Sequence, residues 1–487
     1  MKSIPPFPLF DMLARFLPWA QLFAQPHTLE DFMTVELLSP AGTLKNMRYA
    51  FAYGADAVYA GQPRYSLRVR NNDFDLEHLA LGINEAHEQG KKFYVASNIA
   101  PHNKKVKSYM TDIEPVINMK PDALIMSDPG LIMLVKEKWP ETPIHLSVQS
   151  NVVNWAAVKF WHKQGVERVI LSRELSLDEI EEIRLKVPEM ELEVFVHGAL
   201  CIAYSGRCLL SGYINKRDPN QGTCTNACRW KYDAHEAKET DGGDVIPADA
   251  TEIWTPDNTI IQTDQLPHAP TLGEGGPTDE LFLLQEEGRP NEYMPAFEDE
   301  HGTYIMNSKD LRAIQHVKRL VDIGVHSLKI EGRTKSHYYA ARTAQTYRQA
   351  IDDALAGKEF DMGLMDTLEN LSNRGYTEGF YRRHVHDEYQ NYERGTSEST
   401  KQQFVGEIIQ EIHPDYYTIN VKNKFIEGDE LELMTPRGNT NFTLKGMLST
   451  KQEPKEVAQG AGVKVLIPKV PGVEVCDKTL LMRNLQG

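Results

Sequence analysis

The sequence of 487 residues contains no apolar run as long as the roughly 18 to 20 residues that a membrane-spanning helix needs. It is also poor in basic residues: 53 Lys and Arg face 69 Asp and Glu, giving a formal net charge of −16. The first absence predicts no membrane partner. The second argues against a generally basic surface, so any contact with RNA must be a local patch. His-Glu-x-x-His and Gly-x-Ser-x-Gly motifs are absent too, which removes the usual sequence support for a zinc protease or a serine hydrolase.

Cysteine is scarce, with five residues in the chain, yet four of them lie within 28 residues: Cys201, Cys208, Cys224 and Cys228. Thiolates this close together are typical of one metal centre, because a soft cation or cluster needs several sulfur ligands within bonding distance. Disulfides are disfavoured, since an acidic, enzyme-sized chain without a clear export signal is expected in the reducing cytoplasm. The spacing alone leaves zinc and an iron–sulfur cluster open. Cys476 is remote from the four and is predicted to be a buried apolar residue.

Residues 1–32 form an unusual start. Apolar residues recur there at helical intervals, but four prolines between positions 5 and 18 interrupt the pattern. Charged residues break the apolar stretch and no clean cleavage site follows, so a signal peptide has little support. We interpret this segment as an extension outside the folded core, and expect the first domain to begin at Met33.

From Val35 onward, short apolar segments alternate with amphipathic ones. Helices are expected over Asp75–Gln89 and Ser176–Leu185, where Ser176 and Glu179 match a capping box. The eight predicted strands are Val35–Ser39, Ala57–Ala60, Phe93–Asn98, Ala123–Ser127, Ile144–Val148, Arg168–Ser172, Leu192–Val196 and Ser327–Glu331. Because these strands are nearly continuously apolar, they are expected to pair in parallel. We therefore predict an α/β protein with a TIM-like (β/α)8 barrel; a doubly wound sheet is the alternative.

The repeat is interrupted after the seventh strand. The cysteine segment, 193–230, is followed by an acidic stretch over 235–300 that is rich in Gly and Pro. This composition suits a long, partly mobile surface excursion. Helical patterns return at Ser308–Leu320 and Tyr338–Leu355. We assign residues 33–400 to the barrel domain with this insertion.

A second domain is predicted over residues 401–487. Its strand-length segments include Phe404–Ile409, Tyr416–Val421 and Glu430–Met434, and turn-type residues separate them. The pattern predicts a small antiparallel β-barrel.

Polar residues follow the predicted barrel strands at their carboxyl ends, where the functional face of such a barrel lies. They are Ser39, Tyr59, Asn98, Asp128, Gln149, Asn151, Arg173, Glu174, His197, Glu331 and Arg333. Guanidinium groups pair well with carboxylates, so Arg173 and Arg333 are candidates for holding a dicarboxylate substrate. Internal ion pairs with Glu174 and Glu331 are the alternative. His197 is a candidate base, or a hydrogen-bonded residue of the rim. Arg173, His197, Glu331 and Arg333 are thus the candidate catalytic residues.

A candidate RNA-binding patch combines arginines with aromatic residues, which can hold phosphates and stack on unpaired bases. It consists of Arg64, Tyr65, Arg68 and Arg70 after the second strand, with Arg229, Trp230 and Lys231 after the last clustered cysteine. Lys216 and Arg217, between the cysteines, are further candidates, although solvated loop charges are the preferred interpretation of these two residues.

Several long motifs occur in a fixed order. Residues 36–42 read ELLSPAG, residues 193–211 read EVFVHGALCIAYSGRCLLS, residues 213–229 read YINKRDPNQGTCTNACR, and residues 327–333 read SLKIEGR. From about Val35 to the C-terminus the chain resembles peptidase family U32, and specifically the branch that forms 5-hydroxyuridine in bacterial tRNA.

The resemblance implies a TIM-like barrel and a 4Fe–4S cluster on Cys201, Cys208, Cys224 and Cys228. It implies an oxygen-independent hydroxylation of the tRNA wobble uridine with prephenate as co-substrate. The implied partners are the tRNA anticodon loop and the machinery that assembles iron–sulfur clusters. Related branches leave other substrates open, an rRNA cytidine or a quinone ring, and the family's description leaves peptidase or hydrolase activity open.

The first prediction concerns residues 1–32. A chain that starts at Met33 should be as soluble as the full-length protein and should retain its activity, because the proline-interrupted segment contributes no element of the barrel. Thermal unfolding of the two chains should give the same midpoint within error. Aggregation of the shortened chain would show that the segment is a structural element after all.

Overall fold

The computed structural model describes residues 34–67, 73–200, 204, 207, 220, 232–239, 245–247, 282–286, 293–296, 298–299, 302–303, 309–371, 375–382, 401–409, 413–460 and 462–485. Within these ranges, no helix combines the length and the apolar character that crossing a membrane would require.

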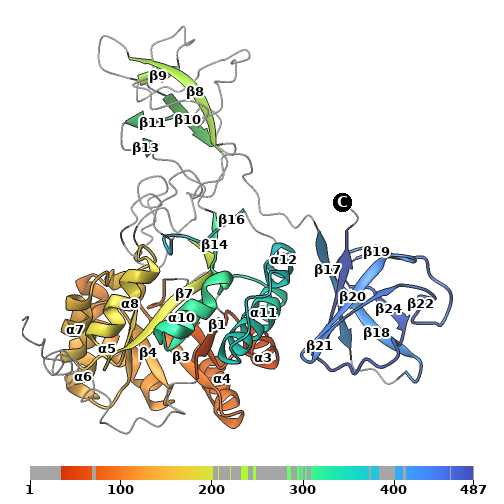
Figure 1. Cartoon of the computed structure of the whole chain (residues 1–487), viewed down its shortest axis with the longest axis horizontal. Helices are drawn as coiled ribbons and strands as arrows, with labels where there is room; N and C mark the ends of the chain where they lie inside the picture. The colour runs from red at the N-terminus through yellow and green to blue at the C-terminus, as the bar shows by residue number, and fades with distance from the viewer. Residues whose placement is uncertain are drawn as a thin grey trace, which may run out of the picture. The chain divides into compact units, whose positions relative to one another are not determined.

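Eight parallel strands form a closed barrel (Figure 1). They are β1 (Glu36–Pro40), β2 (Ala57–Gly61), β3 (Lys92–Ser97), β4 (Ala123–Met126), β5 (Ile144–Leu146), β6 (Arg168–Ile170), β7 (Glu191–Ala199) and β15 (Ser327–Ile330). Closure comes from β15, which pairs in parallel with both β1 and β7. The predicted barrel and its eight strands are confirmed.

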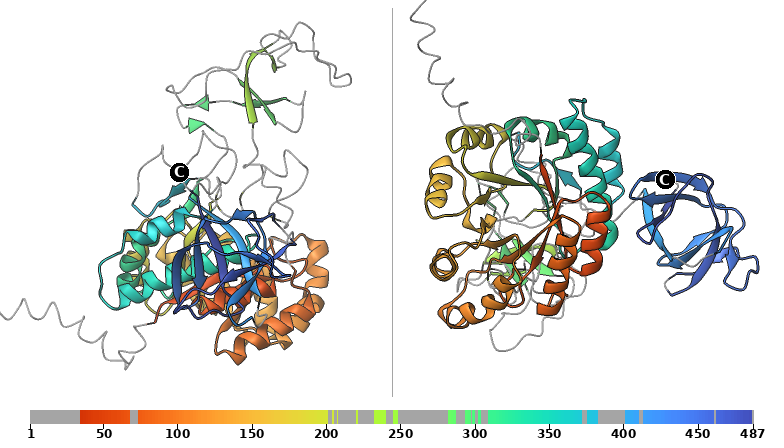
Figure 2. Two further views of the ribbon diagram at one scale, coloured as in Figure 1. Left: turned by 90° about the vertical axis from the view of Figure 1, so that its right-hand side faces the viewer. Right: turned by 90° about the horizontal axis from the view of Figure 1, so that it is seen from below.

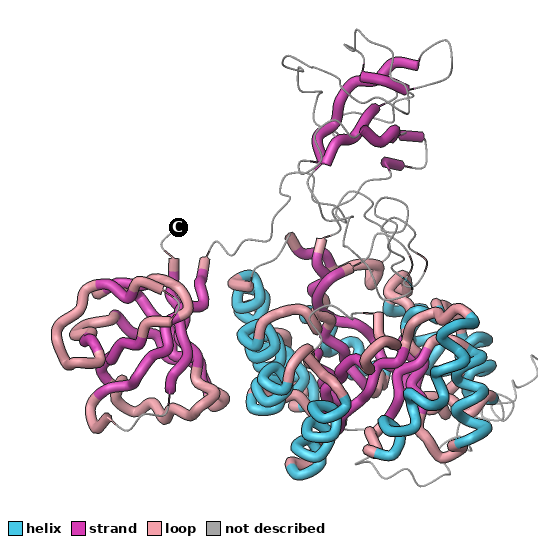
Figure 3. Tube along the Cα trace, turned by 180° about the vertical axis from the view of Figure 1, so that it is seen from behind, coloured by secondary structure: helices cyan, strands magenta, loops and turns pink. Residues whose placement is uncertain are grey.

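Helices surround the strands on the outside of the barrel (Figures 2 and 3). They are α3 (Leu44–Ala52), α4 (Leu76–Glu88), α5 (Asn103–Asn118), α6 (Pro129–Lys138), α7 (Trp155–Lys163), α8 (Leu177–Lys186), α10 (Val317–Ile323), α11 (His337–Leu355) and α12 (Gly363–Glu369). Helix covering explains why strands such as β2 and β4 are buried along their whole length. The predicted capping box is present, since Ser176 accepts from the Glu179 amide and Glu179 accepts from the Ser176 amide.

The segment that precedes β15 differs from its prediction. The helix expected over Ser308–Leu320 begins instead as a short strand, β14 (Asp310–Arg312), followed by a 3-10 turn, Ile314–His316, and then α10. β14 pairs antiparallel with the end of β7, and β16 (Tyr376–Thr377) pairs with β14. Tertiary pairing with β7 therefore overrides the helical pattern of the first residues.

The acidic insertion contains strands, which its composition did not predict. β8 (Tyr232–Glu239), β9 (Val245–Pro247), β10 (Phe282–Glu286) and β11 (Tyr293–Ala296) form one antiparallel sheet. β12 (Glu298–Asp299) pairs with β13 (Gly302–Thr303).

The C-terminal domain is an antiparallel sheet in the strand order β21-β20-β25-β17-β18-β24-β22, with a smaller pair β19–β23. Its strands are β17 (Gln402–Ile409), β18 (Tyr416–Val421), β19 (Phe425–Ile426), β20 (Glu430–Thr435), β21 (Gly438–Thr443), β22 (Leu448–Ser449), β23 (Val457–Ala458), β24 (Lys464–Pro468) and β25 (Leu480–Asn484). Buried residues such as Ile419, Phe425 and Leu481 form its own core. Cys476 is half-buried in a turn, where its sulfur accepts from the Lys478 amide, which corrects its predicted full burial.

Arg342 of α11 contacts the C-terminal sheet through a buried ion pair. Its guanidinium lies 2.9 Å from a carboxylate oxygen of Glu432 in β20, and Gln402 accepts a further bond from it at 3.1 Å. Arg342 is 1% exposed and Glu432 is 7% exposed. Burial lowers the pKa of Arg342, but the neighbouring Tyr338 and Glu432 outweigh burial and raise it. The guanidinium of Arg342 therefore stays charged away from water.

Removing this arginine should be costly. Arg342→Met leaves the Glu432 carboxylate buried without its cation and should lower the free energy of unfolding by about 3–5 kcal/mol. Arg437→Met is the matched control, because Arg437 and its partner Glu474 are 81% and 78% exposed, and its loss should cost less than about 1 kcal/mol. Urea unfolding of both variants measures the difference, and equal costs would contradict this account of the contact.

Candidate active site

Two aromatic rings inside the barrel are surrounded by cationic groups. The Lys329 ammonium lies 4.3 Å from the ring centre of Tyr59 and 5.5 Å from that of Phe195. The Arg173 guanidinium lies 4.1 Å from the Phe195 ring and that of Arg333 lies 5.6 Å from the Tyr59 ring. Ring faces carry negative electrostatic potential, so each ring attracts the cations beside it. The structure thus brings the two predicted arginines to one site, together with a lysine that was not predicted.

Tyr59 and Glu331 form the hydroxyl–carboxylate pair of this site. The Tyr59 hydroxyl lies 3.0 Å from Oε2 of Glu331 and 3.0 Å from the Ile330 carbonyl oxygen. Burial, together with the Glu331 charge, raises the pKa of Tyr59 well above its usual value, while Arg333 and Arg173 oppose that shift. Tyr59 is therefore a neutral phenol that donates its proton in a hydrogen bond.

Arg173 links the Phe195 ring to the carboxyl end of β7. Its Nη1 donates to the carbonyl oxygen of Ala199, the last residue of β7, at 2.7 Å. Its buried Nε has no hydrogen-bond partner among the described residues. Arg173 follows β6 as predicted, and no ion pair with Glu174 is present, because the Glu174 carboxylate accepts from Ser172.

Arg333 is held from β2 by close packing. Its Nη1 donates to Ser66 Oγ at 2.6 Å, and the residue is 6% exposed. A Cβ at Gly61 would lie 2.5 Å from the same Nη1. Glycine at position 61 is therefore required for the guanidinium to reach its place.

A buried ionic network lies on the N-terminal side of the rings. Lys329 bonds Glu193 at 2.7 Å, Glu193 lies 3.3 Å from Arg168, and Arg168 bonds Glu36 at 2.5 Å. β1 and β6 are not neighbours in the sheet, so Glu36 and Arg168 must meet inside the barrel. Burial opposes ionisation of Glu36, but Arg168 outweighs it and lowers the pKa of the carboxyl. The sequence did carry a signal for this network, namely single charged residues within otherwise apolar strands.

His197 does not join the group around Tyr59, which corrects its predicted place. The register of β7 against β15 shifts between Phe195 and His197, and such a bulge turns the following side chain to the other face. The imidazole packs edge-on against Tyr347 of α11, with ring centres 5.5 Å apart, and is 1% exposed. Burial lowers the pKa of His197 to about 3, so the ring is neutral at ordinary pH.

Other predicted residues of this face have structural partners. Asn98 donates from Nδ2 to Ser147 and to Gln149, each at 3.1 Å, which joins the ends of β3 and β5. Asp128 caps the first turn of α6 by accepting from the Leu131 amide. Asp128 lies just after the carboxyl end of β4, as predicted, and serves there as a helix cap.

The RNA patch is only partly within the described residues. Arg64 is exposed and pairs with Asp112 at 2.8 Å. Tyr65 is 0% exposed and its hydroxyl donates to Asp112 at 2.6 Å, so it presents no ring face to a base, which corrects its predicted stacking role. The remaining predicted residues lie outside the described residues: Arg68, Arg70, Lys216, Arg217, Arg229, Trp230 and Lys231.

The four clustered cysteines also lie outside the described residues. Among the residues that are described, no group of three or more His, Cys, Asp or Glu side chains is arranged to hold a metal ion. The donor set itself, four thiolates within 28 residues, fits a four-iron cluster. Cys201 follows Ala199 by two residues, so the clustered cysteines come in sequence directly after the carboxyl end of β7. This is the end of the barrel that carries Arg173 and Glu331.

Two protein-family models match the chain. The model of "Peptidase family U32" matches residues 42–391, and that of the "Peptidase family U32 C-terminal domain" matches residues 400–483. The chain belongs to peptidase family U32. It is similar to two curated U32 relatives, both called tRNA hydroxylation protein P. The one from Escherichia coli K12 is 67% identical over 93% of this chain and 97% of that protein, and the one from Haemophilus influenzae Rd is 64% identical over 92% and 96%. A solved structure, the U32 peptidase Mk0906, matches 37% of this chain and 75% of its own with 12% identity and a TM-score of 0.31.

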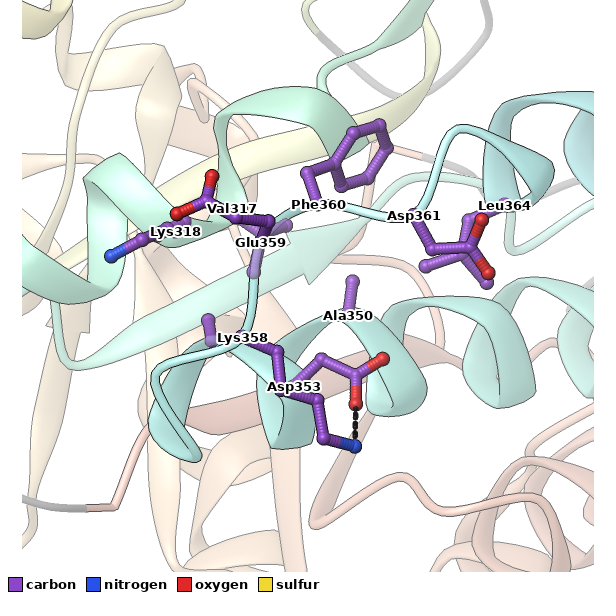
Figure 4. A pocket seen from close by; sticks show the side chains of 10 residues that line it. Val317, Lys318, Ala350, Asp353, Lys358, Glu359, Phe360, Asp361 and Leu364 are labelled. Carbon is purple, nitrogen blue, oxygen red and sulfur yellow. Dashed lines mark hydrogen bonds and ion pairs between the residues drawn. The ribbon is translucent and has the colours of Figure 1, made fainter.

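A separate surface pocket of this U32 chain lies between α10 and the end of α11 (Figure 4). Its lining includes Val317, Ala354, Phe360 and the ion pair of Lys358 with Asp353. None of its lining residues belongs to a barrel strand, so this pocket is not part of the candidate active site.

The burial of His197 predicts how stability depends on pH. The unfolded chain binds a proton at this residue below its ordinary pKa of 6.5, whereas the folded chain does so only near pH 3. The neutral His197 therefore contributes fully to the free energy of unfolding above pH 6.5. This contribution decreases as the pH falls, and about 2 kcal/mol of it is lost at pH 5. His197→Gln should reduce the loss of unfolding free energy between pH 7 and pH 5 by about that amount, measured by urea unfolding. His162→Gln, at an exposed helical position, controls for the loss of a histidine as such. An unchanged pH dependence in the His197 variant would refute the argument.

Proposed function

We propose that this protein hydroxylates carbon 5 of the wobble uridine of tRNA, giving 5-hydroxyuridine, without molecular oxygen. The observation that carries the proposal is its similarity, above 60% identity and over more than nine tenths of both chains, to two proteins called tRNA hydroxylation protein P. Agreement over the full length of both domains supports a shared activity more strongly than a shared fold alone does.

The proposed co-substrate is prephenate, which carries two carboxylates. The site around Tyr59 and Phe195 suits such an anion, because Arg173 and Arg333 approach it from the ends of two different strands. A guanidinium group binds a carboxylate through two parallel hydrogen bonds. Arg173 retains donors for this purpose, since only its Nη1 is engaged by Ala199 within the described residues. The neutral Tyr59 phenol can donate to an oxygen atom of the bound molecule in exchange for its bond to Glu331 or to the Ile330 carbonyl.

The proposed cofactor is a 4Fe–4S cluster held by Cys201, Cys208, Cys224 and Cys228. Such a cluster, when bound, supplies redox or Lewis-acid chemistry to the site. The described residues contribute by holding the carboxyl end of β7, the strand that precedes the four cysteines. Arg173 binds the Ala199 carbonyl, and the Glu331 amide donates to the His197 carbonyl at 2.8 Å. These bonds hold the carboxyl end of β7, which precedes the cysteines in the sequence, against Arg173 and Glu331.

The proposed RNA substrate is the anticodon loop, whose unpaired bases can be turned out of their stack into a barrel mouth. Arg64 can bind a phosphate when it gives up its exposed ion pair with Asp112. Arg68, Arg70, residues 229–231 and the C-terminal domain supply the remaining contacts in this proposal. Because the chain is acidic overall, binding should use few phosphates and depend only modestly on salt.

A peptidase activity is the alternative that the family's description suggests. It would use Cys201 as nucleophile with His197 as its base. The place of His197 argues against this, because the imidazole is buried between β7 and α11 and its lowered pKa makes it a weak base.

The test is nucleoside mass spectrometry of tRNA from a strain that lacks the gene, grown without oxygen so that oxygen-dependent routes do not contribute. The wild-type gene should restore 5-hydroxyuridine derivatives. Cys224→Ala should restore less than a tenth of that level, whereas Cys476→Ala, the cysteine outside the cluster segment, should restore all of it. Protein purified without oxygen should contain about four irons per chain, and the Cys224 variant should lose them.

The outcomes separate the parts of the proposal. Unchanged 5-hydroxyuridine in the deletion strain would reject the tRNA activity. Full rescue by Cys224→Ala would reject the need for the cluster, and stoichiometric zinc without iron would reject its identity. Quantifying hydroxycytidine in rRNA from the same cells tests the substrate of the related branch.

A further inference from the structure

The interior of this barrel is unusual in carrying a chain of charges where such barrels are normally filled by apolar side chains. This series of charges begins at Lys92, whose side chain is half exposed and lies 3.6 Å from Glu36. It continues through Arg168 and Glu193 to Lys329. Lys329 and Glu193 are 3% and 0% exposed. The series of charges therefore ends deep in the barrel, beside the Tyr59 and Phe195 rings of the candidate active site.

Stability does not explain such a network. Buried ion pairs lose about as much free energy in desolvation as they gain in attraction, and apolar residues of the same volume are often equally good or better. A series of buried charges that ends at a site needs another explanation, which the position of Lys329 provides.

We propose that Lys329 is a positioning residue for a doubly charged anion: its ammonium orients the Tyr59 and Phe195 rings and provides positive potential beneath the two arginines. This inference rests on the proposed function, because it assigns a third cation to the same anion site. Arg173 and Arg333 approach the rings from the loops that follow β6 and β15. Lys329 approaches the same rings from within β15.

The charges of this group explain why the lysine matters. Lys92, Arg168, Arg173, Lys329 and Arg333 are five cations, and Glu36, Glu191, Glu193 and Glu331 are four carboxylates. The group is thus one charge positive with Lys329 and balanced without it. A dicarboxylate should lose more binding free energy than a monocarboxylate when that potential is removed, because attraction is proportional to the charge of the ligand.

The protonation of Lys329 depends on its neighbours. Burial lowers the pKa of the ammonium, Glu193 and Glu331 oppose that shift, and Arg333 adds to it. His145 of β5 also interacts with Lys329 electrostatically and is itself neutral through burial. Glu193 is the group that bonds the ammonium directly, so its charge is the main support for the protonated state.

The experiment measures binding of prephenate and of phenylpyruvate, which carries one carboxylate, by calorimetry on the full chain with its cofactor. Lys329→Met should weaken prephenate binding by roughly tenfold to a hundredfold and phenylpyruvate binding by clearly less. Lys329→Arg should restore part of the preference. Lys138→Met, which removes an exposed lysine outside the network, is the control and should bind both anions as the wild type does.

A pH profile separates positioning from a merely structural role, and it also covers the case in which Lys329→Met fails to fold. Glu193→Gln keeps the lysine but removes the charge that supports its protonation. The upper pH limit of prephenate binding should therefore move to lower pH in this variant. Equal binding of both anions to Lys329→Met and wild type, or an unchanged pH profile in Glu193→Gln, would overturn the proposal. Failure of the wild type to bind either anion would reject the anion site and this inference with it, whereas loss of tRNA hydroxylation is scored separately by nucleoside analysis.

Discussion

The parallel pairing of β15 with β7 is the interaction on which the rest of the structure depends. It closes the barrel, and it sets Lys329 directly opposite Phe195 in the register. The same pairing contains the shift after Phe195 that directs His197 toward α11 while Glu193 and Phe195 remain inside. Gly198 follows at a φ of +103°, and a Cβ there would lie 2.3 Å from the Glu331 carbonyl oxygen. The two strands therefore approach so closely at their carboxyl ends that only glycine fits between them.

The architecture was predictable because the signals that specify it are local and repeated. Each strand of the barrel is a short apolar run, and each is followed by a helical pattern, so an error in one element does not alter the conclusion. The prediction failed where long-range pairing decides. Residues 310–312 have a helical pattern, yet they form β14 because the end of β7 offers an unpaired edge to them. Composition alone suggested a surface excursion for the insertion, and it concealed the strands that pair within it.

The candidate site shows the same division. Arg173 and Arg333 were identified because they follow strand ends, and fold class alone places strand ends together. Lys329 and Glu193 were missed because they lie within strands, where a charged residue is usually assumed to face solvent. His197 was assigned to the mouth because it follows the predicted seventh strand, and a one-residue irregularity in the pairing cannot be seen in one sequence. Tyr65 was assigned to the surface because it neighbours arginines, although its ring packs against Tyr109.

The antiparallel pairing of Asp310 with Ala199 has a consequence for how this chain is assembled. The chain leaves the barrel after Ala199 and returns to the neighbouring position more than a hundred residues later, so the insertion begins and ends at one point of the sheet. The entropic cost of closing a loop grows only slowly with its length. The strand pair at the base of the insertion therefore offsets nearly the same cost whether the insertion is long or short. The insertion can therefore lengthen, shorten or be exchanged between relatives while the barrel keeps its register. A change in the length of the insertion would therefore leave unaltered the pairing of β7 with β15 and the side chains that this pairing positions.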